Sequence, residues 1–144
     1  MSINLYRFSS PKSFYPLAKI LAPYFFCSSV ILSLIGLYIS FFVAPTDFQQ
    51  GEAYRIIFVH VPAAWMSMLI YVAMAFWCAV GLSVNSKLSF MFARALAPTG
   101  ALFTLIALVT GSLWSKPMWG AWWVWDARLT SELILLFLYI GFIV

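Results

Sequence analysis

The chain has 144 residues, of which 65% are hydrophobic and only 8% are charged, and its net charge is +4. A soluble domain of this size cannot cover so much apolar surface, so the composition predicts an integral membrane protein. The positive charge does not indicate nucleic-acid binding, because the basic residues form no stripe that could follow a phosphate backbone.

Three apolar stretches are long enough to cross a hydrocarbon core, which takes roughly 20 helical residues. They run over about 20–43, 61–84 and 95–113. A fourth apolar run, 133–144, supplies only about 18 Å of helix and cannot cross alone. We therefore expect an all-α membrane protein with one helical domain over 1–144. Three complete transmembrane helices are followed by the start of a fourth, and we expect the protein to continue beyond Val144.

The charged residues predict how these helices are oriented, since basic residues collect on the cytoplasmic side of a membrane. Basic residues without any acid occupy the amino-terminal arm and the second loop: Arg7, Lys12, Lys19, Lys87 and Arg94. All four acids lie in the loops at about 45–60 and 116–132: Asp47, Glu52, Asp126 and Glu132. This distribution predicts a cytoplasmic amino terminus and places those two loops on the outer face.

The only histidine, His60, lies where the first outward loop enters the second apolar stretch, just before Pro62. Because proline is favoured in the first turn of a helix, we expect His60 at or just before a helix amino terminus. A neutral imidazole there offers a ring nitrogen that can coordinate a metal, including haem iron as an axial ligand. The alternative is a histidine that only caps the helix or anchors it among lipid headgroups.

Four of the seven tryptophans fall within seven residues, beside a carboxylate: Trp119, Trp122, Trp123 and Trp125, followed by Asp126. In a helix Trp119, Trp122 and Trp123 share one face, and in an extended segment Trp119, Trp123 and Trp125 do so. Either arrangement directs at least three indoles together. Two interpretations stay open, namely an aromatic belt at the membrane boundary and a platform for a porphyrin.

Two arginines, Arg55 and Arg128, belong to the outward loops. A guanidinium group pairs with a carboxylate in bidentate geometry, so both arginines are candidates to bind the two propionates of a haem. The alternative for each is a surface ion pair with a neighbouring acid, Glu52 or Asp126, which is worth little by itself.

Three segments resemble one group of haem-handling membrane proteins. The run WGAWWVWDARLTSELILLFLY at Trp119–Tyr139 resembles the tryptophan-rich "WWD" signature found in cytochrome c biogenesis. The segment QQGEAYRIIFVHVPAAWMSM at Gln49–Met68 resembles the histidine region of the cytochrome c maturation protein C family, also called haem exporter protein C. PKSFYPLAKILAPYF at Pro11–Phe25 is similar to the same family.

This resemblance implies a six-helix protein of the bacterial inner membrane, surrounded by membrane lipid, that holds haem b at its periplasmic face. It implies that the haem is presented to the haem chaperone CcmE, with the small membrane subunit CcmD and the ABC transporter CcmA/CcmB as further partners, and that the role is transport rather than catalysis. His60 matches the first of the family's two outward histidines. The residues that match its haem-binding motif are Trp119, Trp122, Trp123, Trp125 and Asp126. The second histidine belongs to a later loop, beyond Val144.

Two other functions remain as alternatives. A haem lyase, which joins haem to apocytochrome thiols, shares the tryptophan motif, although such proteins are larger and carry histidines closely flanking the motif, and none flanks it here. A structural membrane subunit would use its tryptophans only as interfacial anchors.

Overall fold

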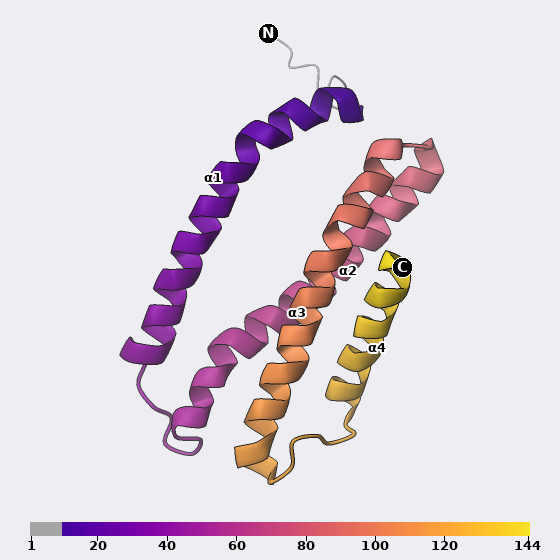
Figure 1. The fold of residues 1–144 in the computed structure, drawn as a ribbon. Helices are drawn as coiled ribbons and strands as arrows, with labels where there is room; N and C mark the ends of the chain where they lie inside the picture. Colours follow the sequence, from indigo (N-terminus) through magenta and orange to yellow (C-terminus); the bar gives the residue numbers. More distant parts are fainter. Residues whose placement is uncertain (1–9) are drawn as a thin grey trace.

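The structure is a computed structural model that describes residues 10–144. Its helices are α1 (Pro11–Tyr38), α2 (Ile57–Val84), α3 (Lys87–Trp119) and α4 (Ala127–Ile143). A short π-helical segment, η2 (Ile39–Val43), continues α1, and a short 3-10 helix, η3 (Glu52–Ile56), leads into α2. No β-strand occurs within residues 10–144, so the predicted all-α class is confirmed (Figure 1).

Helix α1 stands beside the other helices and buries none of its own residues (Figure 1). It begins at Pro11, whose fixed backbone angle suits the first position of a helix. Near this end the Phe14 ring makes an edge contact with Phe92 of α3, at a centroid distance of 5.0 Å. At the other end Arg55 donates hydrogen bonds to the carbonyls of Ser40 and Ala44, at 3.0 and 2.8 Å. These end contacts connect α1 to the rest of the chain.

Helices α2 and α3 form an antiparallel pair joined by a tight turn (Figure 1). Asn85 ends α2 in the left-handed conformation, with φ 50°, which asparagine adopts more readily than most residues. The buried face of α3 is a stripe of small side chains spaced three or four residues apart: Ala93, Ala97, Gly100, Thr104, Ala107, Gly111 and Ser115. Small side chains let helix backbones approach closely, which is how helices associate inside a membrane.

Helix α4 packs against the same stripe of α3, and its Tyr139 and Glu132 contact Ser67 of α2. The Tyr139 side chain is fully buried, lies against Gly100, and donates a hydrogen bond from its hydroxyl to the Ser67 carbonyl at 2.6 Å. The helix starts at Ala127, ahead of the apolar run 133–144, because Asp126 is its N-cap and accepts a hydrogen bond from the Leu129 N–H at 2.8 Å.

Among the described residues, three helical segments are long and apolar enough to cross a membrane: Pro11–Val43, Glu52–Val84 and Lys87–Trp119. Each has 33 residues, or about 50 Å of helix, against about 30 Å for a hydrocarbon core. The three apolar stretches predicted from the sequence lie inside these longer helices. The helix ends therefore extend past the most apolar region, and one set of ends carries the site described below.

The two ends of the bundle differ in charge. Lys12 of α1 and Lys87 at the α2–α3 turn lie at one end, whereas the connections 44–51 and 120–126 lie at the other, which carries the acids Asp47, Glu52 and Asp126 (Figure 1). Arg7, which contributes to the predicted charge pattern, lies outside the described residues. We call the end with the two acid-bearing connections the acidic end.

The helix that carries His60 begins earlier than Pro62 suggests. Segment η3 starts at Glu52 and passes directly into α2, so that Pro62 lies inside the helix. His60 is consequently the fourth residue of α2 and lies in its first turn, with η3 rather than a loop directly ahead of α2. Proline has no backbone N–H and is therefore tolerated near the start of a helix. Its position indicates the region in which a helix starts but not the first residue.

Candidate functional site

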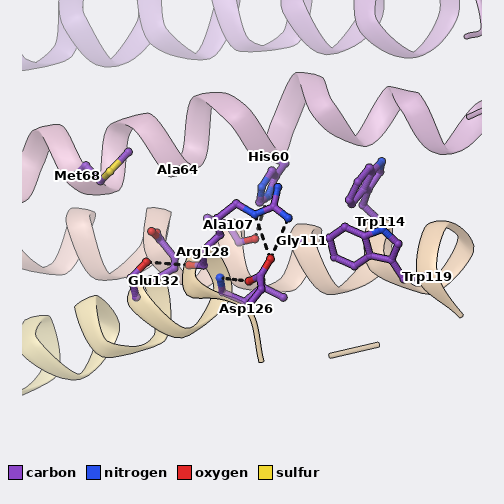
Figure 2. A pocket seen from close by; sticks show the side chains of 12 residues that line it. His60, Ala64, Met68, Ala107, Gly111, Trp114, Trp119, Asp126, Arg128 and Glu132 are labelled. Atoms are coloured by element: carbon purple, nitrogen blue, oxygen red, sulfur yellow. Dashed lines mark hydrogen bonds and ion pairs between the residues drawn. The ribbon is translucent and has the colours of Figure 1, made fainter. Parts of the chain in front are cut away.

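A pocket with a cavity volume of about 260 Å³ opens between α2, α3 and α4 at the acidic end (Figure 2). One face of α2 contributes His60, Ala64 and Met68, which are spaced one helical turn apart. The outer part of α3 contributes Ala107, Gly111, Trp114 and Trp119. The N-cap and first turns of α4 contribute Asp126, Arg128, Leu129, Ser131 and Glu132.

Figure 2 shows how the labelled side chains are arranged along this pocket. Trp114 and Trp119 lie at one end and Met68 and Glu132 at the other, with His60 between them. Along α2, Met68 is eight residues beyond His60, which corresponds to about 12 Å. We call the tryptophan end the outer end and the Met68–Glu132 end the inner end, because the latter lies further toward the middle of α2 and α4.

The hydrogen bonds of His60 determine which of its ring nitrogens is free. Its Nδ1 lies 3.0 Å from the Ala107 carbonyl oxygen and 3.1 Å from the Thr110 hydroxyl oxygen. The Thr110 hydroxyl donates to the Ile106 carbonyl at 2.6 Å, and a carbonyl oxygen can only accept, so both contacts of Nδ1 are satisfied when Nδ1 carries the proton. A neutral imidazole in this tautomer leaves Nε2 with its lone pair available. A histidine that ligates a metal almost always donates its other N–H to a backbone carbonyl or a carboxylate in this way.

A glycine allows the His60 ring to lie close to α3. A Cβ atom added at Gly111 would lie 3.1 Å from Cε1 of His60 and 3.2 Å from a methyl carbon of Leu129, tighter than ordinary contacts. The ring therefore occupies the space that any larger residue at this position would need. Sequence reasoning did not single out Gly111, since its role depends on the neighbour it faces rather than on any backbone turn.

The tryptophans do not form a single face. Trp119 is the last residue of α3, and Gly120 then adopts a left-handed conformation with φ 75°, which ends the helix. Residues 121–126 follow as irregular chain, so neither the helical nor the extended spacing describes the whole run. Trp123 and Trp125 contact each other edge to face at 5.4 Å, and Trp122 lies near the Lys116 ammonium at 5.8 Å.

Only Trp119 of the four clustered tryptophans lines the pocket, and its partner there is Trp114. The two indoles meet edge to face with a centroid distance of 5.1 Å. The indole N–H of Trp114 donates to the Gln50 side-chain oxygen at 2.9 Å, which connects α3 to the first acidic connection. Trp114 was not predicted as a site residue. Its position five residues before Trp119 was the available signal.

Asp126 and Arg128 form an ion pair at the outer end, with the Arg128 Nε and Nη2 atoms 3.0 and 2.9 Å from one carboxylate oxygen. The hydrogen bond from the Leu129 N–H, aided by the Arg128 guanidinium, lowers the pKa of Asp126 below its ordinary value. The Arg128 side chain is 76% exposed and lies 5.6 Å from the Trp119 ring centroid. Its guanidinium is thus positioned beside the Trp119 ring and remains accessible to an anion.

Arg55 has a different environment from Arg128. Its Nε donates to Glu52 at 2.6 Å, its Nη1 donates to two carbonyls at the end of α1, and its side chain is only 15% exposed. It is not among the residues that line the pocket. The surface ion pairs foreseen as alternatives, Arg55–Glu52 and Arg128–Asp126, are both present.

Glu132 is a further pocket residue that was not predicted as part of the site. Its Oε1 lies 2.7 Å from the Ser67 hydroxyl, and Ser67 is fully buried between the helices. In the sequence Glu132 is only the last acid before an apolar run. Its position opposite α2 becomes apparent only once α4 is packed.

Comparison with known proteins gives a consistent assignment. The family model described as Heme exporter protein C matches residues 4–144. Heme exporter protein C of Escherichia coli K12 is 51% identical over 140 residues, which cover 97% of this chain and 57% of that protein. Heme exporter protein C of Haemophilus influenzae is 46% identical over 137 residues, which cover 95% of this chain and 56% of that protein.

A ccmC-like mitochondrial cytochrome c biosynthesis protein of Marchantia polymorpha is 60% identical over 110 residues, which cover 76% of this chain and 48% of that protein. The chain thus spans about half the length of the curated relatives it matches. The names of these relatives refer to haem export and to cytochrome c biosynthesis. By the family match and these identities, the chain belongs to the Heme exporter protein C family.

Proposed function

We propose that the protein binds haem in the pocket at the acidic end and delivers it to a haem chaperone for cytochrome c maturation. The observation that carries this proposal is the hydrogen bond from Nδ1 of His60 to the Ala107 carbonyl, which leaves Nε2 available as an axial ligand of haem iron. Among residues 10–144 no cluster of three histidine, cysteine or acidic side chains gathers as a metal site. A single imidazole instead suits a metal that arrives with four porphyrin nitrogens.

The rest of the pocket also fits haem. Trp114 and Trp119 offer aromatic surface beside the ligand nitrogen, and Arg128 offers a guanidinium for a propionate at the outer end. A cavity of about 260 Å³ is at the small end for a ligand pocket, so a haem held here projects beyond it. The part of the haem that projects from the pocket contacts four further side chains: Trp122, Trp123, Trp125 and Arg55.

We also propose a membrane location, an orientation, a cargo and partners for the protein. We place the protein in the bacterial inner membrane with a cytoplasmic amino terminus and a periplasmic acidic end, because Asp47, Glu52 and Asp126 lie at that end while the end with Lys12 and Lys87 carries basic residues without acids. The cargo is haem b, the recipient is CcmE, and CcmD and CcmA/CcmB are the further partners. The protein itself catalyses no covalent step.

The test is haem binding by the protein purified in lipid nanodiscs, comparing wild type with His60→Ala. We expect the variant to lose the Soret band of bound haem and the ability to load the chaperone, and added imidazole to restore part of the absorbance. Trp65→Phe is the matched control, because Trp65 is a highly exposed residue of α2 outside the pocket. An unchanged Soret band and unchanged chaperone loading in His60→Ala would refute the ligand assignment.

One observation favours a second function, that of a structural subunit anchored by aromatic side chains. Trp122 and Trp125 are 57% and 75% exposed, as interfacial anchors would be. That function predicts that Trp122→Phe combined with Trp123→Phe retains full activity, since phenylalanine still partitions into the boundary region. Loss of bound haem with normal membrane insertion would favour the haem site instead.

A further inference from the structure

The buried hydroxyl of Ser67 lies between two acceptors. Its Oγ is 2.8 Å from the Ala64 carbonyl oxygen and 2.7 Å from Oε1 of Glu132. A hydroxyl has a single proton, so it can donate fully to only one of these oxygens at a time. Both hydrogen bonds are complete together only when Glu132 carries a proton and donates it to Ser67 Oγ.

The same geometry also suits the ionised acid. If Glu132 is a carboxylate, the Ser67 hydroxyl rotates to donate to it, and the Ala64 carbonyl, a helix interior group, keeps its backbone partner in α2. Neither protonation state leaves Oε1 without a hydrogen bond. The Ser67–Glu132 contact is therefore compatible with gain and loss of one proton at Glu132 without rearrangement of the helices.

Tyr139 fixes this contact in place. Glu132 and Tyr139 are seven residues apart on α4 and therefore lie on one face. The Tyr139 hydroxyl donates to the Ser67 carbonyl while Glu132 meets the Ser67 hydroxyl, so that α4 holds Ser67 at two points. The close fit of Tyr139 against Gly100 leaves α4 little freedom to slide.

Glu132 is also the unpaired acid of the pocket. From α2 the titratable group that faces the pocket is His60, and from α3 the lining residues carry no charge. From α4, Asp126 and Arg128 form an ion pair and neutralise each other. The other titratable groups near Glu132 are Tyr139 of α4 and Tyr71 of α2, whose rings are in contact. Glu132 lines the open pocket, and Ser67 contacts only one of its two carboxyl oxygens, Oε1.

We propose that Glu132 is a proton-binding site whose charge is coupled to the oxidation state of haem in the pocket. This inference rests on the proposed haem site. Ferric haem carries one more positive charge than ferrous haem, so the carboxylate stabilises the ferric state. When a one-electron donor reduces the iron, one proton from water enters the open pocket and binds the Glu132 carboxylate. The reaction is ferric haem plus carboxylate plus an electron plus a proton, giving ferrous haem plus carboxylic acid, and the net charge of the pocket is unchanged.

The experiment is a redox titration of the haem-loaded protein in nanodiscs at several pH values, with dithionite as the electron donor. In the wild type we expect the ratio of the protein's affinity for ferrous haem to its affinity for ferric haem to fall as the pH rises. Over part of the pH range the fall should be about tenfold per pH unit, which corresponds to about 59 mV per unit for one electron. Glu132→Gln should remove this dependence, because the amide mimics the protonated acid and keeps a donor toward Ser67. Asp47→Asn, which removes the charge of an acid that does not line the pocket, should retain it.

A second readout does not depend on how well a variant folds. The infrared difference spectrum between reduced and oxidised wild-type protein should gain the C=O band of a protonated carboxylic acid on reduction, and the band should shift in heavy water. Failure of the wild type to bind haem would overturn the proposed function. Bound haem with the same pH dependence in wild type and Glu132→Gln, or an infrared spectrum without the band, would overturn this inference alone.

Discussion

The contact between Tyr139 and Gly100 makes Gly100→Ala the most informative single change to the bundle. An added Cβ would overlap the Tyr139 ring, which is fully buried and cannot turn away. Overpacking of this kind costs about 1–3 kcal/mol, and loss of the Tyr139–Ser67 hydrogen bond costs about 0.5–1.5 kcal/mol. We therefore expect Gly100→Ala to destabilise the protein by about 1.5–4.5 kcal/mol, through displacement of α4 from the α2–α3 pair.

The assay is reversible unfolding in mixed micelles with increasing dodecyl sulfate, followed by tryptophan fluorescence. Gly141→Ala is the matched control, since it lies on α4 and an added Cβ there meets nothing within 4 Å. It should leave stability unchanged or raise it slightly, because alanine favours a helix over glycine by up to about 1 kcal/mol. Equal stability of Gly100→Ala and Gly141→Ala would refute the close-packing account of α4.

Three further predictions concern the pocket. Gly111→Ala should push His60 from its position and weaken haem binding in a Soret titration, whereas the unfolding midpoint changes little. Arg128→Gln should weaken binding of haem but not of its dimethyl ester, which has no free propionates; equal losses for both ligands would exclude the propionate role. Because the Leu129 N–H and Arg128 lower the pKa of Asp126, its stabilising contribution is present above the ordinary value of 3.8 and is lost as the pH falls through the lowered value. Asp126→Asn, which keeps a capping oxygen, should reduce the loss of stability in acid, measured by unfolding at pH values between about 2 and 6.

Composition alone was enough to predict the class of fold, and the positions of the acids predicted that the two acid-bearing connections lie at one end of the bundle. Runs of apolar residues give membrane helices directly, and the separation of acids from bases assigns the loops to two ends. The lone histidine, the tryptophan run with its aspartate and the outward arginines supplied candidate residues, of which His60, Trp119, Asp126 and Arg128 all line one pocket. These predictions depend on properties that each segment carries by itself.

The features that the sequence did not reveal all depend on contacts between segments. Gly120 ends α3, so Trp122 and Trp123 leave the face that helical spacing would give them. Arg55 donates hydrogen bonds to the carbonyls of Ser40 and Ala44, in and just after η2. The packing of α4 against α2 brings Glu132 to Ser67. No local pattern encodes such pairings, because each partner is an ordinary residue in its own segment.

The central claim is that Nε2 of His60 coordinates haem iron, and magnetic resonance of the bound haem tests it most directly. The measurement is pulsed electron–nuclear double resonance of the ferric haem-loaded protein grown with ¹⁵N-labelled histidine, compared with His60→Ala restored by unlabelled imidazole. We predict that the wild type shows a strongly coupled ¹⁵N nucleus and that the variant shows one such nucleus fewer. An identical ¹⁵N spectrum from both proteins would contradict the account.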